Sequence, residues 1–365
     1  MSVETPSGAV DVNDPEVRAQ VGERLQERVV EITRGEGGGN NRLYRVLCAG
    51  GACYALKDYF RPEGPLLGRL RGEFGGLEFL WERGLRKTPR PVSADLEAGY
   101  ALYSWVEGAR PKPESLGVAE VDAGLDFLEE LRGLCLAAAG AELPRAAEAC
   151  FSLCELRENL AQRMARLEGF VERYAAEDAV YVELGAFLKE DFRPHLERFF
   201  TWAEGRYAEL GRAPDALLGS EELTLSPSDF GFHNALRVEG GPLVWLDFEY
   251  FGWDDPAKAA VDFLHHPHPA MALSRELKTH WFRGFVARFS DPPDLSARIE
   301  AAYPLFGLKW IMILLNEFVP KLMQRRAFAE QDRINVTLRR KAQLKRARAW
   351  LQRLRTEHGK FPFSE

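Results

Sequence analysis

The sequence predicts an α+β protein with two lobes, in which a small β-rich lobe precedes a larger, mainly helical lobe. The chain has 365 residues, which is too long for one compact core. Short β-rich segments alternate with glycine-rich turns near the start, whereas the chain from residue 107 onward is mostly helical in pattern. With 46% hydrophobic and 28% charged residues, the composition is that of a globular protein.

The first lobe is expected to open with a helix after a loose tail of residues 1–13. Asp14 is a typical helix-capping residue and Pro15 suits the first helical position, so the helix should extend to about residue 28. Three strands should follow, at residues 29–33, 43–47 and 53–57. Because short glycine-rich turns separate these strands, they are expected to form an antiparallel meander.

A second helix and two further strands complete this lobe. Pro65 begins a helix that ends at Gly84, and Glu73 falls within its stripe of leucines at helical spacing. The remaining strands are expected near residues 90–94 and 100–106, and a lone hairpin later in the chain at 235–238 and 243–246. The predicted division is therefore a first lobe of residues 14–105 and a helical second lobe of residues 106–365.

Charge and cysteine content narrow the class of protein. A net charge of -7 argues against general nucleic-acid binding, which needs a clustered positive surface. Five loosely spaced cysteines indicate reduced thiols in a cytoplasmic protein. The acidic N-terminus lacks the apolar core of a secretory signal, and the longest apolar run, near residues 310–315, is far shorter than a membrane span. The sequence does not indicate an oligomeric state.

One stretch carries a specific chemical arrangement. Asp229 is followed five residues later by Asn234, and a short hairpin then leads to Asp247. Phosphoryl transfer needs a carboxylate that orients the attacking hydroxyl and accepts its proton, and hard oxygen ligands for Mg²⁺. Asp229 can meet the first need, and Asn234 and Asp247 the second.

These residues resemble the aminoglycoside phosphotransferase and choline kinase family, which has a protein-kinase-like fold. The catalytic loop of that family usually reads His-Gly-Asp, four further residues and Asn, and its metal-binding acid often occurs as Asp-Phe-Glu-Tyr, as at 247–250 here. The resemblance covers about residues 25–265. It implies that Asp229 is the catalytic base, that Asn234 and Asp247 bind Mg²⁺, and that ATP or GTP is the phosphoryl donor.

The loop departs from the family pattern at two positions. Pro227 stands where the family has its histidine, and Ser228 where it has glycine. That histidine mostly braces the loop, so its loss affects loop geometry more than chemistry. Ser226, Ser228 and His233 are candidates for a compensating contact.

The first lobe contains candidates for nucleotide binding. Lys57, at the end of a strand, suits a phosphate-binding lysine held by a carboxylate, and Glu73 is favoured over Glu78 as its partner. The turn at 35–41 resembles a kinase glycine loop, in which backbone amides approach the phosphates. Further candidates for nucleotide contacts are Gly37, Gly38 and Asn40 in this turn and Ser104 and Val106 in the segment that links the lobes.

Other signals are weaker. Cys150 and Cys154, and the run His265-His266-Pro267-His268, have partial metal-site spacing, but a metal site is disfavoured for both, and the histidine run is interpreted as a solvated helix end. The basic helix of residues 339–355 is interpreted as a solvated face rather than a nucleic-acid or lipid site. The acceptor pocket is expected to include Glu249, Asp254, Trp310 and Glu317.

The sequence thus predicts a kinase that transfers the γ-phosphoryl group of ATP or GTP to a hydroxyl of an amino alcohol, an aminoglycoside-like molecule or another sugar. Its expected partners are the nucleotide and this small acceptor, with no membrane. A pseudokinase that binds ligands without turnover is the alternative, and Pro227 favours it. A protein kinase is disfavoured because the Asp-Phe-Gly and Ala-Pro-Glu motifs are missing from the expected places.

Overall fold

The structure is a computed structural model that describes residues 10–35, 41–60, 68–138, 140, 142–320, 322 and 336–364. It divides into two compact units. The first contains the described residues up to Arg110 together with Asn234–Gly252, and the second contains Pro111–His233 and the described residues from Trp253 onward. The hairpin near residue 240, which the sequence-based division assigned to the second lobe, therefore belongs to the first unit.

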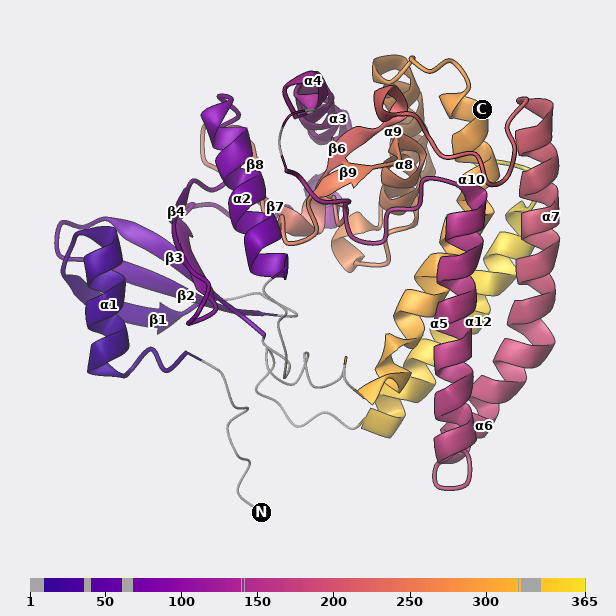
Figure 1. Cartoon of the computed structure of the whole chain (residues 1–365), viewed down its shortest axis with the longest axis horizontal. Helices are drawn as coiled ribbons and strands as arrows, with labels where there is room; N and C mark the ends of the chain where they lie inside the picture. The colour runs from indigo at the N-terminus through magenta and orange to yellow at the C-terminus, as the bar shows by residue number, and fades with distance from the viewer. Residues whose placement is uncertain are drawn as a thin grey trace. The chain divides into compact units, whose positions relative to one another are not determined.

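The first unit is built on a five-stranded antiparallel sheet of order β1-β2-β3-β5-β4 (Figure 1). The strands are β1 (Val29–Arg34), β2 (Asn41–Cys48), β3 (Cys53–Tyr59), β4 (Pro91–Asp95) and β5 (Tyr100–Ser104). The predicted meander is present in β1 to β3. The last two strands are inverted in order, because β5 and not β4 pairs with β3.

The two helices of this unit pack on the sheet. Helix α1 (Pro15–Leu25) begins where expected, since the Asp14 carboxylate accepts a hydrogen bond from the N–H of Glu16. It contributes apolar side chains to a core that includes Leu56 of β3. Helix α2 (Gly68–Glu82) packs on β4 and β5. Because neighbouring side chains on a strand point to opposite faces, Lys57 faces away from the core that contains Leu56.

A later hairpin completes the first unit. Its strands are β7 (Ala235–Arg237) and β8 (Leu243–Trp245), and Ala235 is paired with Trp245. The N–H of Trp245 donates to the carbonyl of Lys87, just after α2, at 2.8 Å. This hydrogen bond ties the hairpin to a segment more than a hundred residues earlier in the chain.

The second unit is mainly helical, and α10 (Leu295–Leu314) is its central element (Figure 1). Helix α10 is buried over most of its length and contacts α5, α7, α8 and α12. The other helices of this unit are α3 (Val118–Gly133), α4 (Cys135–Ala138), α5 (Leu153–Tyr174), α6 (Ala179–Ala186), α7 (Arg193–Glu209), α8 (Pro256–His265), α9 (Arg275–Arg288) and α12 (Val336–Glu357). Short helical turns are η1 (Pro113–Ser115), η2 (Phe187–Phe192), η3 (Ser220–Glu222), η4 (Phe232–Asn234), η5 (Pro269–Met271) and η6 (Leu315–Phe318).

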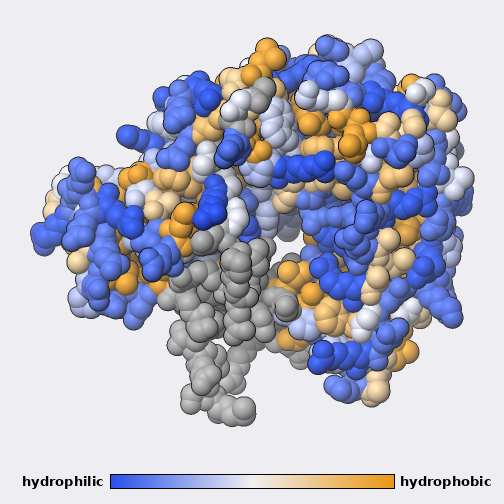
Figure 2. All heavy atoms as spheres, viewed as in Figure 1, coloured by the Kyte–Doolittle hydropathy of each residue, from blue (hydrophilic) through white to orange (hydrophobic). Residues whose placement is uncertain are grey.

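Among the residues that the structure describes, the helical stretch Leu295–Phe318 alone is long and apolar enough to cross a membrane. Within it, 83% of the most apolar window is buried inside the protein, as is usual for a core helix. Hydrophilic residues cover most of the face shown in Figure 2, interrupted by small apolar groups.

A two-stranded sheet supports the loop that carries Asp229. Strands β6 (Thr224–Ser226) and β9 (Gly252–Asp254) pair with each other. The loop leaves β6 at Pro227 and enters η4 at Phe232. Gly231 in this loop is constrained by packing, because a Cβ atom there would lie only 2.7 Å from the sulfur of Met271.

Candidate active site

In the first unit, Lys57 lies between two carboxylates. Its Nζ atom is 2.7 Å from Oε2 of Glu73 and 2.6 Å from Oδ1 of Asp247. The sequence favoured Glu73 over Glu78 as the partner of Lys57, and Glu73 is the residue that forms the ion pair. The contact with Asp247 was not expected, because 190 positions in the chain separate the two residues.

Glu73 is held by further donors and is only 4% exposed. The Tyr59 hydroxyl donates to Oε2 of Glu73 at 2.6 Å, and the N–H of Phe248 donates to Oε1 at 3.3 Å. Burial alone would lower the pKa of Lys57, but the carboxylates of Asp247, Glu73 and Glu249 raise it well above its usual range. The lysine therefore stays protonated and can serve as a fixed positive charge.

Asp247 has an uncommon backbone conformation, with a φ of 65°. Aspartate is among the few non-glycine residues that enter this left-handed region readily, and such conformations cluster at functional sites. The N–H of Leu246 donates to the carbonyl of Asn234 at 2.8 Å, which brings the chain at Asn234 beside the segment that leads to Asp247. A carboxylate and an amide oxygen at adjoining ends of one hairpin are a donor set that fits Mg²⁺.

Glu249 was expected to line the acceptor pocket, but it is 3% exposed and is bonded within the first unit. Its Oε2 accepts a hydrogen bond from Nδ2 of Asn41 at 2.8 Å, and Arg69 lies 3.8 Å away. Glu249 thus anchors the start of β2. The predicted glycine-loop residues Gly37, Gly38 and Asn40 lie outside the described residues.

Ser104 and Val106 are the candidates for nucleotide contacts in the segment that was expected to link the lobes. The N–H of Ser104 donates to the carbonyl of Arg90 at 2.8 Å, and the Ser104 hydroxyl accepts from the N–H of Arg90 at 2.9 Å. The Ser104 N–H is therefore engaged within the first unit. A nucleotide contact remains a prediction for Val106, which follows the end of β5.

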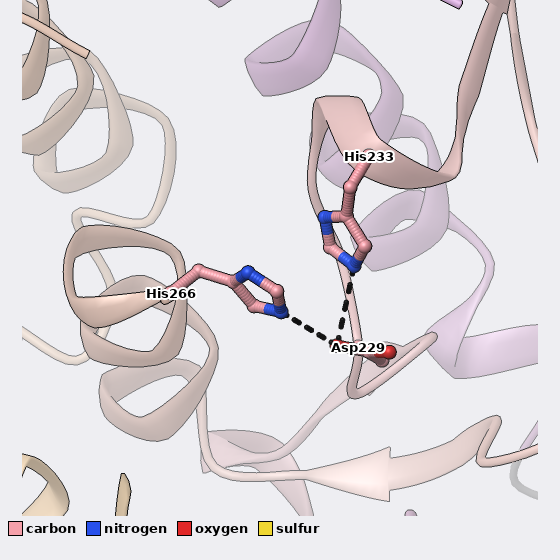
Figure 3. Close-up of side chains that lie close together, drawn as sticks. All are labelled: Asp229, His233 and His266. Atoms are coloured by element: carbon pink, nitrogen blue, oxygen red, sulfur yellow. Dashed lines mark hydrogen bonds and ion pairs between the residues drawn. The ribbon is translucent and has the colours of Figure 1, made fainter. Parts of the chain in front are cut away.

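In the second unit, Asp229 lies against two histidines (Figure 3). Nε2 of His266 is 2.9 Å and Nε2 of His233 is 3.4 Å from Oδ1 of Asp229. Burial alone would raise the pKa of Asp229, but the hydrogen bonds from His233 and His266 hold it well below its usual range. Burial lowers the pKa of His266, so that ring is neutral near pH 7 although it lies beside a carboxylate.

The ligand atoms of Asp229, His233 and His266 lie within 4.8 Å of one another, close enough to be considered as a metal site. The ring arrangement argues against this reading. The two imidazoles are stacked, with centroids 3.9 Å apart and an angle of 21° between their planes. A metal ion binds near the plane of each imidazole ligand, about 2.0–2.1 Å from its nitrogen. With the rings stacked in this way, an ion in the plane of one imidazole would lie well outside the plane of the other.

Hydrogen bonds fix the backbone of the loop that carries Asp229. Ser228 has a φ of 65°, a conformation that favours glycine, the residue expected here from the family pattern described above. Its hydroxyl donates to the carbonyl of Ala147 at 2.8 Å and accepts from Nζ of Lys258 at 3.0 Å. Its N–H donates to the hydroxyl of Ser226 at 2.9 Å. Two of the three candidate compensating residues thus brace the loop, and the third, His233, contacts Asp229 itself.

Comparison with known proteins gives structural relatives only. The sequence matches no family model, and no curated protein matches it. The gentamicin complex of APH(2")-IIa has a TM-score of 0.60 at 16% identity, over 94% of this chain and 97% of that chain. Choline kinase from Cryptosporidium parvum has a TM-score of 0.60 at 10% identity, over 96% and 98%. Choline kinase LicA from Streptococcus pneumoniae has 0.56 at 17% identity, over 93% and 98%.

The chain has the protein-kinase-like fold of these structures. The predicted α+β fold class is therefore confirmed. At this level of identity the likeness establishes the fold, and the roles of individual residues rest on the geometry given above.

Within this kinase-like fold, the remaining acceptor-pocket candidates are buried and engaged in the second unit. Asp254 is fully buried and accepts a hydrogen bond from Nζ of Lys258 at 2.8 Å. Nε1 of Trp310 donates to Asp262 at 2.9 Å, and Glu317, which is 1% exposed, lies 3.0 Å from Nε of Arg339. These contacts favour structural roles for Asp254 and Glu317, since a carboxylate paired inside the protein is poorly placed to recognise a ligand.

His266 is the contact of Asp229 that sequence reasoning missed. The run of histidines that contains it was interpreted as a solvated helix end. Only His268 fits that description, whereas the His266 side chain is 7% exposed. Two features of the sequence could have indicated this contact: a histidine just after a predicted helix, and the absence at Pro227 of the histidine that the family pattern places in the loop of Asp229.

Proposed function

We propose that this protein is a small-molecule kinase that moves the γ-phosphoryl group of ATP or GTP to a hydroxyl of its acceptor. The observation that carries the proposal is the position of Lys57 between Glu73 and Asp247. Carboxylates 16 and 190 positions away along the chain converge on one ammonium group, so tertiary folding and not local sequence builds this cluster. A fixed lysine beside oxygen ligands for a metal is the arrangement that a triphosphate needs.

Each residue of the first unit has a distinct role in this proposal. Lys57 binds phosphate oxygens, and Glu73 keeps its ammonium in place. Asp247 and Asn234 would hold Mg²⁺, which when bound neutralises charge on the phosphates. Kinases of this kind need no covalent intermediate, because positioning and electrostatics supply most of the rate enhancement.

Asp229 acts on the acceptor in this proposal. Its carboxylate orients the hydroxyl and accepts the proton as the phosphoryl group is transferred. A pKa held well below the usual range makes it a weak base but keeps it ionised. That property suits a reaction with a loose transition state, in which orientation of the nucleophile matters more than early removal of its proton.

We infer that the acceptor is an alcohol that also carries an amino group. Structural neighbours are named as choline kinases, an ethanolamine kinase and aminoglycoside phosphotransferases. Those acceptors share a hydroxyl and a cationic nitrogen, which is the chemistry to test first in this chain. Neutral sugars form the comparison group.

The alternative is a pseudokinase, and Pro227 is the feature that favours it. Release of ADP or GDP should be measured with a panel of amino alcohols, aminoglycosides and neutral sugars, alongside nucleotide affinity by calorimetry. Acceptor-dependent release that requires Mg²⁺ supports the kinase. Tight nucleotide binding without release over the whole panel supports the pseudokinase.

A further inference from the structure

The three histidines at and just after the end of α8 make different contacts, and His266 is the one that is hydrogen-bonded to Asp229. His265 is buried, with Nε2 2.8 Å from the carbonyl of Tyr303. His268 is exposed, and its Nδ1 accepts the N–H of Ala270 at 3.1 Å, capping a short helical turn. His266, between them, lies with Nε2 2.9 Å from Oδ1 of Asp229.

The hydrogen bonds of His266 fix which of its nitrogens carries the proton. The backbone N–H of His268 points to Nδ1 of His266 at 3.2 Å, so Nδ1 must be the acceptor. In the neutral ring the hydrogen then resides on Nε2, which donates it to Asp229. Ligation of a metal through Nε2 would require the opposite tautomer, in which two N–H groups would face each other.

Packing holds the His266 ring in this orientation. One face stacks on His233 at 3.9 Å between centroids, and the ring of Trp310 meets it edge to face at 4.9 Å. The prolines at 267 and 269 restrict the backbone that supplies the His268 N–H. A donor that is packed on two sides and bonded at both nitrogens is pre-organised for the carboxylate.

We propose that His266 is the positioning residue of the catalytic loop, donating Nε2–H to Oδ1 of Asp229 and replacing the brace that Pro227 cannot provide. This inference rests on the proposed kinase function, since it assigns the group that orients the base. The replacement comes from outside the loop, 37 residues later in the chain.

Kinetics of two variants test the positioning role. His266→Gln keeps an N–H donor near the place of Nε2, whereas His266→Phe keeps the ring and its stacking but has no donor. We expect His266→Phe to lower kcat on the order of 10–10²-fold with little change in KM for the nucleotide, because a misplaced catalytic group costs this much. His266→Gln should recover most of the loss.

His280 provides a matched control. Its Nε2 lies 2.7 Å from Asp122 in a second histidine–aspartate contact, on the surface of the same unit. His280→Phe should leave kcat unchanged. Equal kcat in the native protein, His266→Phe and His266→Gln would overturn the proposal, as would equal losses in the Phe and Gln variants.

A measurement independent of turnover separates failure of this inference from failure of the proposed function. Nitrogen-15 NMR of the imidazoles should report His266 as the Nε2–H tautomer, with a shift that changes in Asp229→Asn. If the native protein shows no turnover, the kinase proposal fails, and the tautomer still decides whether the contact exists. An Nδ1–H tautomer, or stoichiometric Zn²⁺ binding lost in His266→Gln, would overturn the positioning role.

Discussion

The two units hold their candidate functional residues, Lys57 and Asp229, with different chemical groups. In the first unit a protonated lysine lies between two carboxylates, so full charges face one another. In the second unit the carboxylate of Asp229 lies against the imidazoles of His233 and His266. Phosphate recognition calls for a permanent cation. The proposed base needs hydrogen-bond donors that keep its carboxylate ionised and oriented, and the imidazole of His266 supplies one.

The largest effect is expected from the charged cluster of the first unit. Asp247→Asn removes the carboxylate charge but suits the left-handed backbone, because asparagine also enters that region readily. Turnover should fall by several orders of magnitude while thermal unfolding is nearly unchanged, since a proposed metal ligand and a partner of Lys57 are lost together. Steady-state assays over a range of Mg²⁺ concentrations provide the check, and native-like turnover would rule out the metal-binding role.

A large but more selective loss is expected at Asp229, the proposed base. Asp229→Asn keeps size and shape but cannot accept a proton, so kcat should fall by ~10²–10⁴-fold. Nucleotide affinity should change little, because the proposed nucleotide contacts lie in the first unit. Such a split between turnover and binding marks an interaction made in the transition state. If Asp229→Asn instead abolishes nucleotide binding or unfolds the protein, Asp229 is a structural residue and the contrast between the units fails.

The ion pair should show a measurable coupling. In a double-mutant cycle of Lys57→Met and Glu73→Gln, nucleotide affinity should reveal an interaction free energy of ~0.5–3 kcal/mol. The same cycle with Glu78→Gln is the control, and its losses should add. Additive losses with Glu73 would mean that Asp247 alone holds the lysine.

The smallest effect is expected at Ser228, the left-handed residue of the second unit. Ser228→Gly relieves backbone strain of about 1 kcal/mol. It also removes the hydroxyl bonds to Ala147 and Lys258, each worth about 1 kcal/mol. Unfolding free energy should therefore change by no more than ~1–2 kcal/mol, and kcat should stay within a few-fold of native. A large loss of kcat would show that the Ser228 hydroxyl, and not His266, is the principal brace.

Local patterns predicted much of the fold. Asp14 and Pro15 correctly predicted where α1 begins. The glycine-rich turns predicted the bounds of the first three strands to within two residues. The pairing of β5 with β3 was not predictable, because strand order is set by tertiary contacts between segments that are distant in the chain. Likewise, the hairpin of residues 235–245 was expected from its sequence, but its membership of the first unit follows from contacts such as the one between Trp245 and Lys87.

The candidate site shows the same division between local and distant information. Lys57 and Glu73 could be paired from sequence because strand and helix periodicity place each side chain on a face. Asp247 joined them only through tertiary folding. His266 could not be assigned to Asp229 from a histidine run alone, since its role depends on a hydrogen bond from His268 and on stacking against His233.

The discontinuous first unit constrains how this protein can be recombined. The chain leaves that unit after Arg110 and returns to it at Asn234, immediately after the loop of Asp229. A fragment that ends at residue 110 would carry Lys57 and Glu73 but lack Asp247 and the Phe248 N–H that binds Glu73. Chimeras that exchange only the N-terminal segment between relatives would therefore combine Lys57 of one parent with Asp247 of the other. Such chimeras should retain activity only when residues 234–252 are transferred together with the N-terminal segment.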